Sequence, residues 1–216
     1  MSKRRTPYVL VGDLSAHPAA MAWSRLHGNG RTPKAIHVLK DPRGKSHRTG
    51  VFRLENLGPA GAAVIAKRCR GEGAQLEHRI YENILPQLSI VGLRSHGIVA
   101  DLDGPYSWLF LEEATGTEYS HDDVAHRALA AEFLATLHSS SQTLEDLSQL
   151  PDRGPAHYRL LLEAAQDSIA KNASNPALTE DDIGTLQTLA SRFDRLASRW
   201  GALETVCSRM PDTLVH

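Results

Sequence analysis

The chain has 216 residues, with 24 basic and 25 acidic side chains and a formal net charge of −1, so no excess of positive charge favours a nucleic-acid partner. No apolar run reaches the roughly 18 residues of a membrane span, and no apolar signal segment opens the chain, which predicts a cytoplasmic protein without a membrane partner. Cys69 and Cys207 are too few and too far apart to predict a disulfide framework or a thiolate metal site.

The first 40 residues carry separate, short signals. An apolar run at 8–11 is typical of a strand, the segment 19–26 is typical of a helix, and a second apolar run follows at 35–39. The His-Gly-Asn-Gly segment at 27–30 predicts a turn between the last two. We treat residues 1–40 as an N-terminal extension whose structure the sequence does not define.

Residues 41–116 have the pattern of a small lobe with a sheet. Four segments alternate or run apolar as strands do: 51–55, 62–66, 96–101 and 108–111. A helix is expected over 74–88, between the two strand pairs. This order of elements predicts a five-stranded antiparallel sheet with one packed helix.

Residues 117–216 have a helical pattern. Ser120 is the predicted N-cap of the first helix, because acidic residues follow it in the first turn, where the helix dipole favours them. Further helices are expected over 156–170 and from Thr179 to Leu203. A sheet-rich front and a helical back predict an α+β fold of two lobes, joined near 112–116.

Lys67 and Glu77 form the first pair of candidate functional residues. The predicted helix has one apolar face, made by Leu76, Ile80, Tyr81, Ile84 and Leu88. Glu77 shares this face because it precedes two of its members by three and four residues. A buried carboxylate without a partner is costly, and Lys67 on the packed strand is the nearest cation. The pair is therefore either a functional site or a structural ion pair.

The second candidate is the end of the strand at 108–111, where Glu112 and Glu113 precede a glycine. One interpretation is a strand end followed by a polar turn. The other is a hinge between the lobes, whose backbone N–H and C=O groups bind a nucleotide base. The residues alone leave both interpretations open.

Four short blocks resemble, in order, those of the aminoglycoside phosphotransferase and choline kinase superfamily, which has a protein-kinase-like fold. The blocks are Val64-Ile65-Ala66-Lys67, Glu77-His78-Arg79-Ile80-Tyr81, Leu109-Phe110-Leu111-Glu112-Glu113 and Leu134-Ala135-Thr136-Leu137-His138. The resemblance covers about residues 44–216 and implies ATP-dependent transfer of a phosphoryl group to the hydroxyl of a small-molecule acceptor. It implies that Lys67 holds the α- and β-phosphates, that Glu77 orients Lys67, and that the Glu112–Glu113 backbone binds adenine.

The resemblance also bears on the last residues. Thr213-Leu214-Val215-His216 matches the approach to the family's catalytic loop, of which His216 would be the first residue. The catalytic aspartate and the ligands of Mg²⁺, which the intact family member uses, would then lie beyond residue 216. We therefore predict no metal ligand in this sequence and expect a truncated chain that binds nucleotide weakly and transfers no phosphate by itself.

The loop over the phosphates departs from the glycine-rich pattern of the family. Only Gly44 and Gly50 bracket it, and Ser46 and Arg48 are its predicted phosphate donors. An ordinary solvated loop is an equal alternative at this position.

Other functions stay open beside the phosphotransferase. The chain could be a non-catalytic kinase-like remnant or interaction module, or an unrelated α+β domain. If part of the helical lobe is missing, Phe133, Phe193 and Trp200 are expected to be partly exposed, which favours self-association. The sequence does not identify the acceptor.

Overall fold

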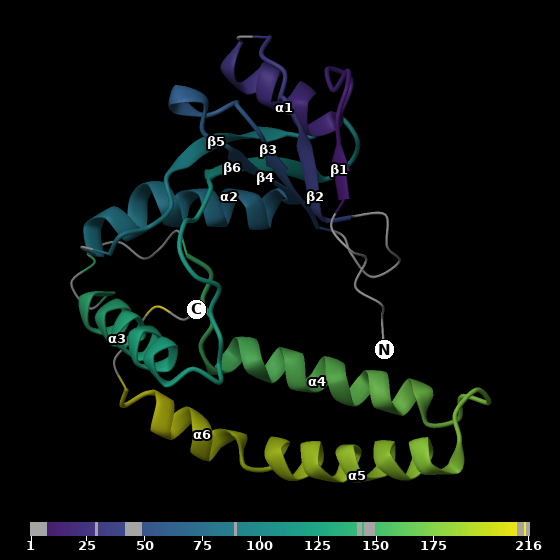
Figure 1. Cartoon of the computed structure of the whole chain (residues 1–216). Helices are drawn as coiled ribbons and strands as arrows, with labels where there is room; N and C mark the ends of the chain where they lie inside the picture. The colour runs from purple at the N-terminus through teal and green to yellow at the C-terminus, as the bar shows by residue number, and fades with distance from the viewer. Residues whose placement is uncertain are drawn as a thin grey trace. The chain divides into compact units, whose positions relative to one another are not determined.

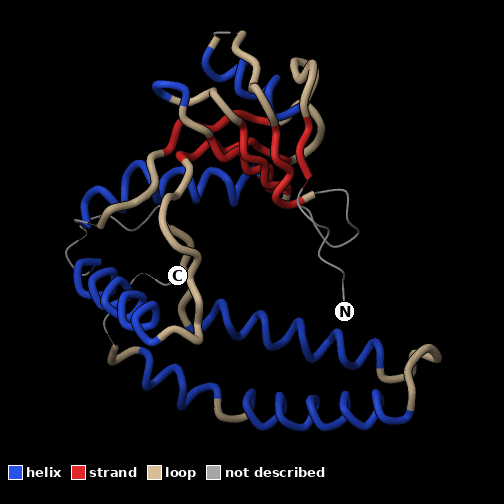
Figure 2. Tube along the Cα trace, viewed as in Figure 1, coloured by secondary structure: helices blue, strands red, loops and turns tan. Residues whose placement is uncertain are grey.

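The computed structural model describes residues 8–28, 30–41, 49–88, 90–141, 144, 150–210 and 214. The chain divides into two compact units, Met1–Leu137 and His138–His216. Figures 1 and 2 show that the strands all lie in the first unit, whereas the second is helical. None of the helices in the described ranges has the length and apolar character needed to cross a membrane.

An antiparallel sheet forms the centre of the first unit (Figure 2). Its strands within the described residues are β1 (Tyr8–Leu10), β2 (Ile36–Lys40), β3 (Gly50–Leu54), β4 (Val64–Arg70), β5 (Ser95–Ala100) and β6 (Tyr106–Glu112). They lie in the order β1-β2-β3-β4-β6-β5, and every neighbouring pair is antiparallel. The predicted α+β class, with an N-terminal antiparallel sheet followed by helices, is confirmed.

Helix α1 (Pro18–His27) covers one face of this sheet (Figure 1). The side chains of a strand alternate between faces, and the members on this face are fully buried. They are Ile36, Val38, Phe52, Leu54, Val64, Ala66, Trp108 and Phe110. Trp23 of α1 packs edge-on against Phe110, with ring centroids 5.2 Å apart. The core of the first unit therefore lies between α1 and the sheet.

Local sequence signals set both ends of α1. Pro18 occupies the first turn, where a missing backbone N–H costs nothing, and the His17 side chain accepts a hydrogen bond from the Ala19 N–H at 3.2 Å. Gly28 ends the helix in the left-handed conformation, with φ 64°, and its N–H donates to the Ser24 carbonyl.

Helix α2 (Gly71–Arg79) packs on the other face of the sheet. It buries Ala74 against Leu109 and Leu111 of β6. The helix predicted over 74–88 is one continuous run but not one helix type. After α2 the backbone forms a π-helical turn, Ile80–Ile84, and then a 3₁₀ turn, Leu85–Leu88. Pro86 explains the change, because proline lacks an N–H and its ring clashes with the carbonyl four residues back in an α-helix.

Helix α3 (Val124–Ser141) begins later than predicted, and Asp123 is its cap. The Asp123 Oδ1 accepts hydrogen bonds from the N–H groups of Ala125 at 2.8 Å and His126 at 3.3 Å. The prediction of Ser120 as N-cap is wrong. Its hydroxyl oxygen accepts from the Asp122 N–H in the preceding turn, because a capping side chain must lie directly before the helix.

The second unit contains α4 (Pro155–Asn172), α5 (Glu180–Ala197) and α6 (Trp200–Cys207). The predicted start near Thr179 is confirmed by a capping box. The Thr179 hydroxyl oxygen accepts from the Asp182 N–H at 3.2 Å, and the Asp182 carboxylate accepts from the Thr179 N–H at 2.9 Å.

The helix predicted to continue to Leu203 is interrupted after Ala197. The Ser198 hydroxyl donates to the Arg195 carbonyl at 2.9 Å, a local bond that competes with regular helix geometry. The break places Trp200 at the start of α6. Trp200 is buried, contrary to the expectation of partial exposure, whereas Phe133 is exposed and Phe193 is half-buried, as expected.

Two histidines flank Trp23 and have lowered pKa values. The ring centroid of Trp23 lies 3.9 Å from that of His27 and 5.9 Å from that of His96. Burial lowers the pKa of His27. Burial, followed by the positive charges of Arg94 and His27, lowers the pKa of His96, and Glu112 opposes this weakly. The folded protein therefore favours the neutral form of both rings.

We expect the protein to lose stability as the pH falls from about 6.5, the ordinary histidine pKa, towards the lowered folded values. The unfolded chain binds the extra protons, at up to about 1.4 kcal/mol per pH unit for each histidine. The Tm measured from pH 7.5 to 5.0 checks this, and replacing both His27 and His96 with Gln should flatten the profile. A wild-type Tm that is constant across this range would contradict it.

Candidate functional site

Four half-buried side chains form an open strip on the face of the sheet that α2 packs against. They are Val51 and Arg53 on β3 and Ile65 and Lys67 on β4. Val51 lies opposite Lys67 and Arg53 opposite Ile65, so all four point to the same side. We call this set the β3–β4 strip. Its residues alternate with Phe52, Val64 and Ala66, which are buried under α1 on the opposite face.

Lys67 at one end of the strip is paired with Glu77 of α2, as the sequence predicted. The Lys67 Nζ donates to the Glu77 Oε2, and the two side chains are 30% and 26% exposed. The prediction placed Lys67 at a strand end, but β4 continues to Arg70, so Lys67 lies within the strand. Sheet hydrogen bonds on both sides of β4 therefore fix the backbone that carries it.

The side chains beside this pair are uncharged near neutral pH. Burial raises the pKa of the Cys69 thiol and of the Tyr81 phenol; the charge of Glu77 adds to both shifts, and the charge of Lys67 opposes them. Lys67 and Glu77 form the ion pair of this small cluster. An ammonium carries three N–H donors and the carboxylate accepts from one of them, which leaves donors for an anion that reaches the strip.

Glu112 and Glu113 lie where β6 ends and the chain leaves the sheet. The Glu112 N–H donates to the Arg94 carbonyl at 2.9 Å, and its carboxylate accepts from the Arg94 N–H at 2.9 Å. The Glu113 carboxylate accepts from the Arg53 Nε at 2.5 Å. Within the described residues, no hydrogen bond to the backbone of Ala114 is present. Glu112 therefore ties the end of β6 to the segment before β5, and Glu113 ties the next residue to β3.

Arg53 was not singled out from the sequence, where it reads as one polar member of an alternating strand. Its Nη1 donates to the Glu55 Oε1 at 2.9 Å, and the His37 Nε2 lies 2.8 Å from the same oxygen. The Glu113 and Glu55 carboxylates raise the pKa of Arg53 against the effect of burial. The hydrogen bonds of His37 and Arg53 lower the pKa of Glu55. A line of ionisable groups thus links β2, β3 and the residue after β6.

Three predicted site residues lie outside the described residues. These are Ser46 and Arg48 in the segment between β2 and β3, and His216. Their predicted roles stay predictions.

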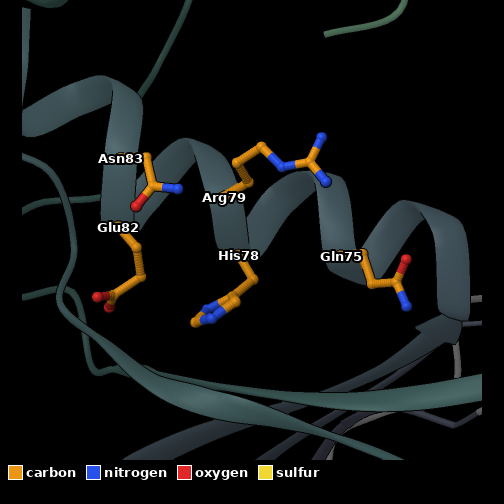
Figure 3. A pocket seen from close by; sticks show the side chains of 5 residues that line it. All are labelled: Gln75, His78, Arg79, Glu82 and Asn83. Atoms are coloured by element: carbon orange, nitrogen blue, oxygen red, sulfur yellow. The ribbon is translucent and has the colours of Figure 1, made fainter. Parts of the chain in front are cut away.

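A shallow hollow runs beside α2 and its π-helical turn (Figure 3). Its lining is polar and consists of Gln75, His78, Arg79, Glu82 and Asn83. Neither Lys67 nor Glu77 lines it, so the hollow is separate from the β3–β4 strip. The His78 Nδ1 lies 2.9 Å from the Ser95 Oγ, which ties α2 to β5.

The described part of the chain holds no group of three or more histidine, cysteine, aspartate or glutamate side chains placed to bind a metal ion. We therefore assign no role in the site to a metal ion.

Comparison with solved structures finds a similarity at low sequence identity. No family model matches the chain, and no curated protein matches it. The chain is similar to the crystal structure of an aminoglycoside-3'-phosphotransferase of type VIII, with 21% sequence identity and a TM-score of 0.45. The match covers 83% of this chain and 64% of that one, so the chain spans less than two thirds of the length of the solved structure.

Proposed function

We propose that this chain binds ATP on the β3–β4 strip and forms the nucleotide-positioning part of a phosphotransferase that acts on the hydroxyl of a small molecule. One observation carries the proposal: a lysine fixed within a central strand is oriented by a glutamate from the packed helix, on a half-open face. This function places the protein in the cytoplasm, where ATP is available.

The Lys67–Glu77 pair has the chemistry of a phosphate clamp. The Glu77 carboxylate holds one N–H of Lys67, and the remaining donors can make charge-assisted hydrogen bonds to phosphate oxygens. A lysine held in this way needs little reorganisation when the triphosphate arrives. Positioning and charge stabilisation of this kind supply most of the catalysis in phosphoryl transfer.

The rest of the strip suits a nucleoside. Val51 and Ile65 present an apolar surface beside Lys67, on which the flat face of a base can pack. The backbone after Glu113 lies beyond the end of β6, where N–H and C=O groups can bond to the edge of a base. The apolar side chains can thus bind the base of a nucleotide while the neighbouring Lys67 binds its triphosphate.

In the proposed reaction the acceptor hydroxyl oxygen bonds to the γ-phosphorus of ATP while the bond from that phosphorus to the β,γ-bridging oxygen breaks. ADP leaves with the electron pair of the broken bond, and the hydroxyl proton passes to a base. Lys67 holds the α- and β-phosphates and offsets the negative charge that develops on the leaving group. We assign no described residue to the base.

Thermal unfolding of the wild-type chain with ATP, adenosine or tripolyphosphate tests this function. A ligand that binds only the folded state stabilises it by RT ln(1 + [L]/Kd), about 2.7 kcal/mol at 100 times Kd. We expect ATP to raise the Tm most and tripolyphosphate to raise it less, because the latter contacts only the Lys67 end. A folded chain whose Tm does not respond to millimolar ATP would overturn the proposal.

A further inference from the structure

We propose that Arg53 and Glu113 are positioning residues that fix the backbone against which the nucleotide base binds. This inference rests on the proposed function and assigns a role to the end of the β3–β4 strip opposite Lys67. Neither side chain is proposed to take part in phosphoryl transfer.

The Arg53–Glu113 pair lies across β4. Arg53 lies opposite Ile65 on β4, and Ile65 lies opposite Leu111 on β6, so the three form one row on the strip face. Glu113 follows Leu111 by two residues, and its carboxylate reaches back to the Arg53 guanidinium at 2.5 Å. The ion pair therefore spans β4 beside Ile65, whereas Lys67 lies one row further, about 7 Å along the strand.

Two carboxylates hold the Arg53 guanidinium. Arg53 donates through Nε to Glu113 and through Nη1 to Glu55, and the Glu55 oxygen also contacts His37. A planar guanidinium bound by two carboxylates has a fixed orientation that a flexible ammonium does not reproduce. About a third of each side chain is exposed, so the ion pair adds little to the free energy of unfolding. Its main effect is therefore to fix the orientation of the two side chains.

The pair acts on the backbone that leaves β6. Arg94 holds Glu112 on the side of β5, and Arg53 holds Glu113 on the side of β3. The peptide groups that follow thus come after two adjacent residues, one held on the β5 side and the other on the β3 side. A base edge meets a backbone that is already ordered, so binding does not have to order it.

The test separates the base from the phosphates. We would measure Kd for ATP and for tripolyphosphate with wild type, Arg53→Met and Arg68→Met. Arg68 is the matched control because it forms a similar ion pair, with Asp101, but alternates with Lys67 on β4 and so belongs to the opposite face. We expect Arg53→Met to weaken ATP binding about 10-fold with tripolyphosphate binding unchanged, and Arg68→Met to change neither Kd.

Equal loss of ATP and tripolyphosphate binding in Arg53→Met would overturn the inference, because it would show a general structural effect. No loss of either, or the same selective loss in Arg68→Met, would overturn it as well. If Arg53→Met does not fold, Glu113→Gln breaks the same pair from the hinge side, and the same selective loss is expected. A wild-type chain that binds neither ligand contradicts the proposed function itself, a result distinct from wild-type ATP binding that is insensitive to Arg53.

Discussion

Replacing Lys67 with Met should weaken ATP binding by about 10- to 100-fold and leave the fold intact. A lost charge-assisted contact is worth about 1.5–3 kcal/mol, and each 1.4 kcal/mol is tenfold in Kd. Lys67 is 30% exposed, so its pair with Glu77 adds no more than about 1 kcal/mol to stability. Calorimetric titration with ATP, together with the Tm of each protein, measures both quantities.

Three further variants show whether the loss of ATP affinity comes from the Lys67–Glu77 pair. Glu77→Gln should cost less, about 3- to 10-fold, because Glu77 orients Lys67 without meeting the nucleotide. Added to Lys67→Met, it should cost nothing more, since there is no ammonium left to orient. Lys34→Met removes an exposed lysine elsewhere in the first unit and should leave the Kd unchanged. If Lys34→Met and Lys67→Met raise the Kd for ATP equally, the cause is the loss of a positive charge and not a contact made by Lys67.

Replacing Phe110 with Ala should lower the free energy of unfolding by about 3–5 kcal/mol, the usual cost of deleting a buried aromatic ring. Phe110 on β6 is fully buried and meets Trp23 of α1 edge-on. Its loss leaves a cavity between the sheet and α1 that neither can fill without shifting. Urea unfolding followed by tryptophan fluorescence measures the change.

Phe133→Ala is the matched control for Phe110→Ala, because Phe133 on α3 is 42% exposed. It should change the unfolding free energy by less than about 1 kcal/mol. Similar losses in the two variants would contradict the placement of the core between α1 and the sheet.

Local patterns in the sequence predicted most of the elements and one end of the candidate site. Alternation gave the strands, and the 3.6-residue period placed Glu77 on the face that meets Lys67. The start of a helix near Thr179 was also predicted, and the structure confirms it with a capping box. Each of these signals lies within one element or its nearest neighbour.

The features that could not be predicted depend on distant residues or on small local competitions. Arg53 and Glu113 are 60 residues apart, and their meeting depends on the register of three strands. The change of helix type before Pro86 and the break at Ser198 depend on a few local bonds that periodicity does not detect. The packing of α1 on the sheet face opposite α2 also depends on tertiary contacts.

The alternation along β4 also protects the pairing of the sheet against error. Val64 and Ala66 face the core under α1, and Ile65 and Lys67 face the strip. A slip of one residue would turn every side chain over and bury the ammonium of Lys67, unpaired, beneath α1. The charge that we assign to nucleotide binding thus also penalises the wrong register while the chain folds, and an uncharged residue at position 67 would remove that safeguard.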